Sequence, residues 1–403
     1  MDEEKIRGYF PILEKKIKGK PIIYLDSACM SLKPKPVIDS INEYYLEYTS
    51  CGERSSHAFG RETTKRMEKT RERVKKFFNA KNASEIVFTK NTTEGINLIA
   101  KSFPFQKNDI IISTGKEHNS NLVPWLQLAK EKQIKHNIMS TDNGFNLEEF
   151  ESILKQQNCE NIMVSIVHTS NMDGSSNPAK EIIKIAHEND ALVMLDAAQS
   201  APHKKIDVKK LDVDFISFSG HKMLGPTGTG ILYGKEELLK KLNPFMTGGD
   251  TVKETTYTSV EYENLPEKFE AGLQNYANFI GLGEAIKYLG KYIEDIEEHE
   301  IKLNTIATEG LKEYVNILGP QNPKLRTGIF SFNAKNKMDF HEIALLLDET
   351  NNIMIRSGAH CVHSWFNAHN MKGSARASFY LYNTEDEAKH FVEKTKELLK
   401  MKK

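Results

Sequence analysis

Short apolar runs alternate with helical patterns through the middle of the chain, and this alternation constrains the fold more than any other feature. Apolar and β-branched runs are typical of buried strands, whereas apolar residues spaced three and four apart are typical of helices. Helices are expected from about residue 93, over 62–78 and over 178–189. The predicted strands are 85–89, 109–113, 161–167, 191–195, 214–218 and 230–233. Strand and helix in succession predict an α/β fold with a parallel sheet covered on both faces.

The pattern changes after a long helical stretch that we expect over 279–314. Strands are predicted over 327–332 and 376–382, and helices over 339–348 and 385–399. Runs of this kind indicate a smaller α+β domain at the C-terminal end.

A chain of 403 residues is long enough for two domains. We expect an N-terminal segment, 1–20, that packs with the small domain. A large domain is expected over 21–290 and a small domain over 291–403.

The composition is that of an ordinary globular protein. Acidic and basic residues balance at 55 each, so no nucleic acid or anionic membrane is expected as a partner. The N-terminus is charged, and no apolar run is long enough to span a bilayer. Four cysteines without a CxxC pair indicate a cytoplasmic, disulfide-free protein.

Polar residues follow four of the predicted strands. Ligands of open α/β sheets bind beyond the carboxyl ends of the strands, so these residues are the candidate site. Together they supply an anion site, a carboxylate, amides and an amine. The four stretches are 90–95 (KNTTEG), 168–171 (HTSN), 196–199 (DAAQ) and 219–222 (SGHK).

Each of these residues also has an ordinary interpretation. Thr92 and Thr93 open a helix and could hold a phosphate, but most such threonines only cap the helix. Asp196 could keep a cofactor's ring nitrogen protonated, or could simply begin a turn. Lys222, beside His221, could bond covalently to an aldehyde, or could be a surface lysine.

The glycine-rich stretch 224–230 (LGPTGTG) argues against two other kinds of site. A P-loop requires Gly-Lys-Ser/Thr after its glycines, which this stretch lacks. A dinucleotide fingerprint must open a helix, whereas this stretch leads into the predicted strand 230–233. The glycines more readily let the backbone pass close to a bound ring.

The order of the motifs, Thr-Thr-Glu-Gly, Asp-x-x-Gln and Ser-Gly-His-Lys, resembles the fold-type I pyridoxal-phosphate enzymes of aminotransferase class V. The resemblance covers residues 24–383, and its finer match is to SufS-type cysteine desulfurases. It is carried by YLDSACMSLKP, VFTKNTTEGINLIA, KEHNSNLVPW, VHTSNMDGSSNP, DAAQSAPH, FSGHKMLGPTGTGILYG, KFEAG, IRSGAHC and RASFYLYNT. It implies a mostly parallel, seven-stranded sheet, pyridoxal 5'-phosphate as cofactor and a homodimer.

The resemblance also implies a role for each site residue. Lys222 would bond covalently to the cofactor and then move a proton at the substrate Cα. Asp196 would pair with the ring nitrogen, Gln199 would bond the phenolic oxygen, and His118 would stack on the ring. The residues implied for the phosphate are Thr92, Thr93, Ser219 and His221.

The substrate residues follow from the same resemblance. Asn171 would contact the cofactor and substrate together. Arg376 would bind the substrate carboxylate, a task that suits its bidentate geometry. Arg356 and His57 would line the same pocket.

Cys361, in the loop RSGAHCVH, is the implied sulfur acceptor. The resemblance implies that L-cysteine becomes L-alanine and that Cys361 keeps the sulfur as a persulfide for an acceptor or Fe–S scaffold protein. Thiolates are good nucleophiles, and Arg356, His360 and His363 lie nearby in sequence. A structural cysteine is the alternative. A zinc site is disfavoured by the close spacing of His360, Cys361 and His363, so no metal is expected.

Two positions depart from the family pattern. Ala359 stands in place of a histidine in the cysteine loop. Leu273 stands in place of a threonine that reaches the partner subunit's phosphate. We hypothesise that Thr247 or Gln274 replaces the lost donor.

Two other functions remain open from the sequence. A selenocysteine lyase, or another class V lyase or aminotransferase, would share Lys222 and Asp196, and Cys361 would distinguish it from a desulfurase. A non-catalytic scaffold protein with this fold would have little reason to keep Lys222 and Asp196.

Overall fold

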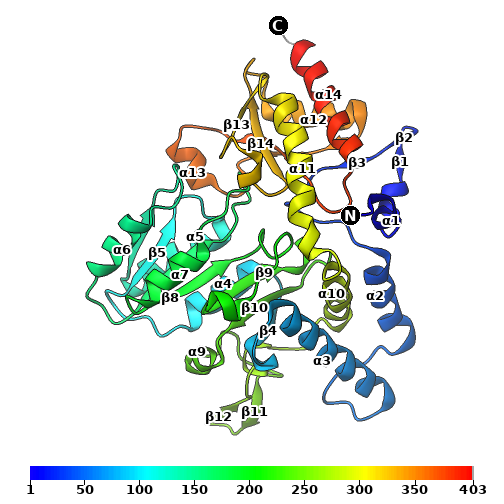
Figure 1. The fold of residues 1–403 in the computed structure, drawn as a ribbon. Coiled ribbons are helices and arrows are strands. Elements are labelled where there is room, and N and C mark those ends of the chain that lie inside the picture. The colour runs from blue at the N-terminus through cyan, green and yellow to red at the C-terminus, as the bar shows by residue number, and fades with distance from the viewer. Residues whose placement is uncertain (402–403) are drawn as a thin grey trace.

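The structure, a computed structural model, describes residues 1–401 and is built on a seven-stranded sheet (Figure 1). The strand order is β4-β10-β9-β8-β7-β5-β6. β10 runs antiparallel to both of its neighbours, and the remaining pairs are parallel. The strands are β4 (Ile86–Thr89), β5 (Ile110–Thr114), β6 (Lys135–Met139), β7 (Ile162–Val167), β8 (Ala191–Asp196), β9 (Phe215–Ser219) and β10 (Gly230–Gly234). The predicted α/β fold with a mostly parallel sheet is confirmed.

Helices cover this sheet on both faces (Figure 1). They include α3 (Ala58–Phe78), α4 (Thr92–Ser102), α5 (Asn119–Lys132), α6 (Leu147–Lys155), α7 (Ala179–His187), α8 (Val208–Leu211), α9 (Glu236–Lys241) and α10 (Tyr276–Leu289). Neighbouring strand residues point into different cores: Val164 and Val193 pack in one, Met163 and Met194 in the other. Burial on both sides explains why these strands read as continuous apolar runs.

The start of α4 lies close to the carboxyl end of β9 because two glycines allow it. A Cβ atom at Gly230 would come 2.5 Å from Cα of Asn91, the N-cap of α4. A side chain at Gly95 would overlap that of Ser217 in β9. The free N–H groups of the first helical turn are thereby brought beside Ser219 and the loop that carries Lys222.

The C-terminal part forms a four-stranded antiparallel sheet in the order β13-β14-β17-β16. The strands are β13 (Val315–Ile317), β14 (Ile329–Ala334), β16 (Arg356–Gly358) and β17 (Ser374–Ser378), and the helices are α11 (Ile293–Leu311), α12 (Phe340–Asn351), α13 (His363–Ala368) and α14 (Glu385–Met401). The helical stretch expected over 279–314 is two helices, α10 and α11, which Gly290 separates. The strand expected over 376–382 ends at Ser378, because Tyr380 and Tyr382 turn into the main core.

The N-terminal residues contact both parts of the molecule. The elements of this N-terminal segment are α1 (Glu3–Arg7), β1 (Lys16–Ile17), β2 (Lys20–Pro21), β3 (Ile23–Tyr24) and α2 (Lys35–Glu47). The ring of Phe10 packs against Tyr288 of α10 and Tyr382, and β3 pairs with β15 (Ile353–Met354). The domain limits at residues 20 and 290 remain predictions.

A hairpin of β11 (Val252–Thr255) and β12 (Val260–Tyr262) projects from the body of the molecule (Figure 1). Within residues 1–401, none of the helices combines the length and apolar character needed to cross a membrane.

Candidate active site

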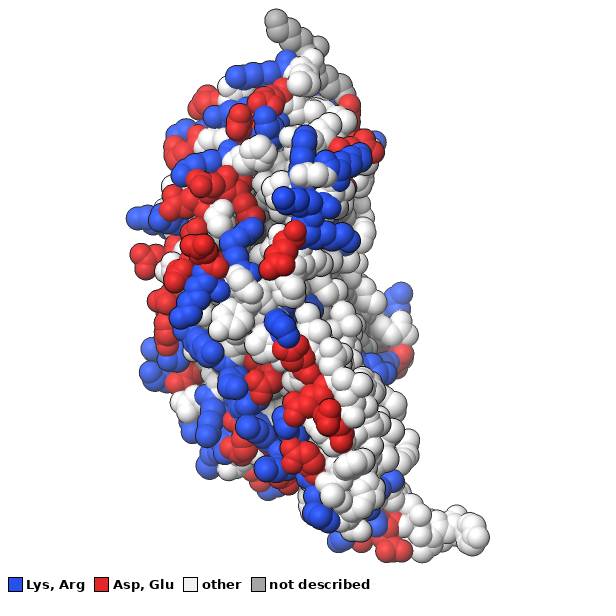
Figure 2. Space-filling model, turned by 90° about the vertical axis from the view of Figure 1, so that its right-hand side faces the viewer, with Lys and Arg blue, Asp and Glu red and all other residues white. Residues whose placement is uncertain are grey.

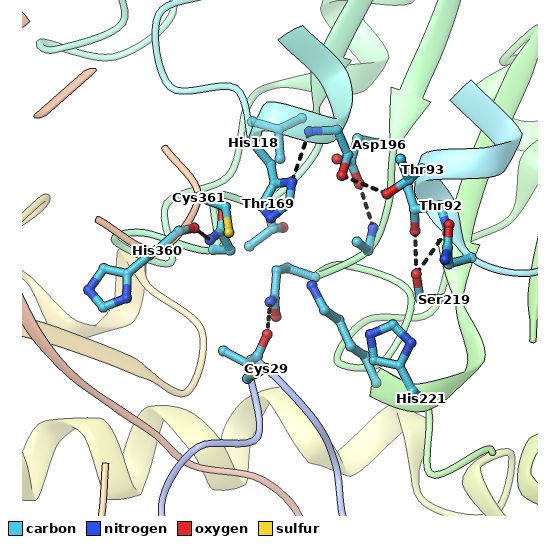
Figure 3. Close-up of a pocket in the computed structure, with 18 of the residues that line it drawn as sticks. Cys29, Thr92, Thr93, His118, Thr169, Asp196, Ser219, His221, His360 and Cys361 are labelled. Atoms are coloured by element: carbon cyan, nitrogen blue, oxygen red, sulfur yellow. Dashed lines mark hydrogen bonds between the residues drawn. The ribbon is translucent and has the colours of Figure 1, made fainter. Parts of the chain in front are cut away.

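A cavity of about 210 Å³ lies where the carboxyl ends of the parallel strands meet the C-terminal sheet (Figure 3). It brings together every residue that the sequence predicted for the site except His57. The predicted residues in its wall are Thr92, Thr93, His118, Asn171, Asp196, Gln199, Ser219, His221, Lys222, Arg356, Cys361 and Arg376. His57 is exposed and caps α3, where its Nδ1 accepts a hydrogen bond from the Gly60 amide at 3.3 Å.

Asp196 and Lys222 line the cavity at the ends of two neighbouring strands: Asp196 is the last residue of β8, and Lys222 lies in the turn after β9. Burial lowers the pKa of the Lys222 amine, and the Asp196 carboxylate partly opposes this effect. A lowered pKa favours the neutral amine, which is the form that attacks a carbonyl carbon. Asp196 ends β8 and is itself buried, which raises its pKa. The protonated ring nitrogen of a bound cofactor would stabilise the charged form of this carboxylate.

Hydroxyl groups gather at the first turn of α4. Ser219 Oγ accepts a hydrogen bond from the Thr92 amide at 2.9 Å and lies 2.8 Å from Thr92 Oγ1. Thr93 Oγ1 lies 2.7 Å from Oγ of Ser120, at the first turn of α5. Two helix N-termini therefore point toward one polar cradle, which suits a phosphate group.

Two histidines of the cavity wall carry no charge at neutral pH. His118 caps α5, where its Nδ1 accepts a hydrogen bond from the Ser120 amide at 3.0 Å. Burial lowers the pKa of His118 to about 3 and that of His221 to about 4. A neutral imidazole can stack on an aromatic ring without adding a further positive charge beside Lys222, Arg356 and Arg376.

Several buried polar atoms of the cavity wall have no hydrogen-bond partner among the described residues. They are Asn171 Oδ1, Gln199 Oε1, Arg376 Nε and His360 Nδ1. Buried polar atoms are almost always paired in folded proteins, so these atoms indicate a polar ligand. The polar cradle, the buried carboxylate and the amine fit pyridoxal 5'-phosphate, and the free Arg376 Nε fits a substrate carboxylate.

Arg356 and Arg376 lie directly opposite each other on β16 and β17. Opposite residues of an antiparallel pair project on the same face, so both guanidinium groups reach the cavity. Arg376 donates to the carbonyl oxygen of Asn171 at 2.9 Å and to Asp26 at 3.2 Å. Arg356 donates from Nη1 to Sγ of Cys29 at 2.9 Å.

Hydrogen bonds from Asn119 and Asn171 hold the loop that carries Cys361. The carbonyl oxygen of Cys361 accepts a hydrogen bond from the Asn119 amide at 2.7 Å, and that of His360 accepts one from Asn171 Nδ2 at 2.7 Å. His360 and Cys361 have φ values of +49° and +59°, in the left-handed region that non-glycine residues seldom adopt. The surrounding bonds hold this strained turn, which places Cys361 in the cavity wall (Figure 3).

The residues at this site to which the sequence interpretation assigned no role include Asp26, Cys29, Thr169 and Ser120. Cys29 and Thr169 line the cavity, and Asp26 binds Arg376. Asp26 and Cys29 were visible in the stretch YLDSACMSLKP, where both follow a short apolar run. An acid and a thiol within a segment that carries the family resemblance could have marked both as candidate site residues.

Of the two positions that depart from the family pattern, Ala359 lies beside His360 in the cysteine loop and packs against Val362 and Phe366, whereas Leu273 lies outside the cavity wall. Leu273 and Thr247 are exposed. The side-chain amide of Gln274 donates to the carbonyl oxygens of Glu270 and Gly272 in its own loop. Whether either residue replaces the lost donor remains a prediction.

The chain matches the family model of the class V aminotransferases over residues 23–391. The probable cysteine desulfurase of Halalkalibacterium halodurans is 39% identical over 98% of both chains. The apo structure of the cysteine desulfurase of Thermococcus onnurineus NA1 is 36% identical and superimposes with a TM-score of 0.93, covering 99% of this chain and 98% of that chain. The crystal structure of the cysteine desulfurase CsdA (S-sulfonic acid) from Escherichia coli is 31% identical, with a TM-score of 0.91 over the whole of both chains.

The chain belongs to the class V aminotransferase family. Its full-length relatives in that family are named as cysteine desulfurases. Pyridoxal 5'-phosphate is the cofactor that this membership assigns to the cavity.

Proposed function

We propose that this protein is a cysteine desulfurase that takes sulfur from L-cysteine onto Cys361 and releases L-alanine. The observation that carries the proposal is the position of Cys361 in the same cavity wall as Lys222, Asp196 and Arg376. The names of the full-length relatives support the same reaction.

The residues of the cavity would divide the binding of the cofactor between them. Lys222 would hold it through its amine, Asp196 would face its ring nitrogen, and His118 would lie against its ring. The first turns of α4 and α5 would hold its phosphate. The bound cofactor would supply an electron sink for the Cα atom of the amino acid.

The remaining residues would act on the amino acid itself. Arg376 would bind the carboxylate through its free Nε, and Lys222 would move the proton at Cα. Cys361 would attack the substrate sulfur as a thiolate. The carbon–sulfur bond breaks, a sulfur–sulfur bond forms, and the products are L-alanine and a Cys361 persulfide.

The test is alanine formation from L-cysteine by the cofactor-loaded protein and by Cys361→Ser. We expect the variant to bind the cofactor with unchanged absorbance but to form almost no alanine. Cys51→Ser is the matched control, because Cys51 is exposed and outside the cavity wall. Undiminished alanine formation by Cys361→Ser would instead point to a lyase that does not need this thiol.

We further propose that the protein is a homodimer that passes sulfur from Cys361 to an acceptor or Fe–S scaffold protein. Tyr45, Leu46, Phe59 and Leu273 are large apolar side chains that are more than half exposed in one subunit. Figure 2 shows acidic and basic residues mixed over one half of the view and mostly uncharged residues along the other. Exposed apolar side chains such as these four suit a subunit interface.

Sedimentation of Leu46→Asp checks the dimer. We expect this variant to sediment as a monomer, whereas Leu345→Asp, on the exposed side of α12, should sediment like the wild type. If Leu46→Asp sediments as a dimer, like the wild type and Leu345→Asp, then Leu46 does not lie in the subunit interface.

A further inference from the structure

The cavity wall contains two thiols, although the proposed reaction uses one. Cys29 and Cys361 come from segments more than 300 residues apart in sequence, and both line the cavity that holds Lys222 (Figure 3). Both are partly buried and neither forms a disulfide. A structural cysteine belongs in an apolar core, whereas Cys29 contacts Arg356 and lies near Arg376 and Lys222.

One of the two arginines of the site contacts Cys29. Arg356 Nη1 donates to the sulfur of Cys29 at 2.9 Å. Sequence proximity suggested Arg356 as a partner of Cys361, but β16 turns its side chain toward the N-terminal segment instead. Thiols beside a guanidinium group are typical reactive nucleophiles.

The chemistry of the cavity gives Cys29 a substrate. A persulfide on Cys361 extends that side chain by one sulfur–sulfur bond, about 2 Å. Its outer sulfur therefore reaches further from the Cys361 backbone than the thiol does, and thiolates attack such sulfur atoms readily.

We propose that Cys29 is a second sulfur-accepting thiol, which takes the outer sulfur from the Cys361 persulfide. In this step the sulfur–sulfur bond at Cys361 breaks and a new one forms at Cys29. The proton of the Cys29 thiol ends on Cys361, so no oxidant or reductant is consumed. Arg356 holds the sulfur at position 29, and Cys361 is free for a second molecule of L-cysteine. This step rests on the proposed function.

The experiment measures where sulfur accumulates. The cofactor-loaded protein is mixed with L-cysteine without any acceptor or reductant, and alkylated peptides are examined by mass spectrometry at successive times. We expect the persulfide first on the Cys361 peptide and then on the Cys29 peptide. The first burst of alanine should be halved in Cys29→Ser, because one storage thiol is removed.

Three variants make the result decisive. Cys361→Ser should leave the Cys29 peptide unmodified, since Cys29 receives its sulfur from Cys361. Cys51→Ser and Cys159→Ser should accumulate as much sulfur as the wild type, because both thiols lie outside the cavity wall. A Cys29 peptide that stays unmodified while Cys361 becomes labelled overturns the inference, as does direct labelling of Cys29 in Cys361→Ser. Absence of both alanine and Cys361 labelling refutes the proposed function instead.

Discussion

The guanidinium group of Arg376 donates a hydrogen bond from Nη2 to Oδ1 of Asp26, which lies 3.2 Å away. A second bond, from Nη1 to the carbonyl oxygen of Asn171, leaves Nε without a partner among the described residues. Burial raises the pKa of Asp26, and the two neighbouring arginines oppose that effect. Asp26 therefore orients the arginine before a substrate arrives and leaves one of its donors free.

Arg376→Lys tests the assignment of the carboxylate site. Lysine keeps the charge beside Asp26 but cannot supply the free Nε donor. A hydrogen bond to a charged group contributes about 1.5–3 kcal/mol, so KM for L-cysteine should rise roughly ten- to hundredfold. The rate of alanine formation against L-cysteine concentration measures this. Arg326→Lys, at a buried arginine outside the cavity wall, should leave KM unchanged.

Lys222→Ala tests the covalent attachment of the cofactor. The wild type should be yellow after reconstitution, and the variant should lose the absorbance band of the lysine-bound cofactor. The phosphate cradle at Thr92 and Ser219 is intact in the variant, so pyridoxal 5'-phosphate should still bind reversibly. An unchanged spectrum in Lys222→Ala would show that the cofactor is attached to a lysine other than Lys222. Lys90→Ala, at an exposed position before α4, is the control.

Glu270 is predicted to stabilise the loop that ends at the unusual Leu273. Its carboxylate accepts two hydrogen bonds from Arg71, at 2.8 and 2.9 Å, and one from the Phe88 amide at 2.7 Å. Removing one partner of a buried ion pair leaves the other charge unpaired. Glu270→Ala should therefore lower the free energy of unfolding by about 3–5 kcal/mol, as measured by urea denaturation.

The matched control is the exposed pair of Lys253 and Glu261 on the β11–β12 hairpin. Loss of an exposed ion pair changes stability by about 1 kcal/mol or less, so Glu261→Ala should unfold near the wild-type midpoint. Equal effects of the two substitutions would show that the Arg71–Glu270 pair is not a stabilising contact.

Much of the fold could be predicted because most strands of the large sheet are buried on both faces. β7 and β8 read as unbroken apolar runs for that reason. The edge strand β6 was missed, since Lys135 and Ile138 face solvent and its sequence has no apolar run. Gly290 was missed as a helix end because the apolar pattern continues from α10 into α11.

The part of the site that could be predicted from the sequence consists of the residues that follow the ends of strands. Thr92, Asp196 and Lys222 each follow a strand of one sheet, so the topology alone brings them together. The contact of Arg356 with Cys29 depends on the register of β16 against β17 and joins residues 327 positions apart. No local pattern encodes a contact of that kind.

The stability of the protein should fall in mild acid because of His168. Burial lowers the pKa of this imidazole from its ordinary 6.5 to about 4. Between these two values the unfolded chain binds a proton that the folded chain does not, so the free energy of unfolding falls as the pH falls from 6.5 to 4. One such group contributes a slope of about 1.4 kcal/mol per pH unit.

His168→Gln removes this proton uptake and should flatten the dependence of stability on pH by up to that amount. Urea denaturation of the cofactor-free protein at several pH values between 6.5 and 4 gives the slope. His390→Gln, at a partly exposed position on α14, should keep the wild-type slope. If both variants keep that slope, burial does not keep the proton off His168 in the folded protein, and the cause of the pH dependence lies at another group.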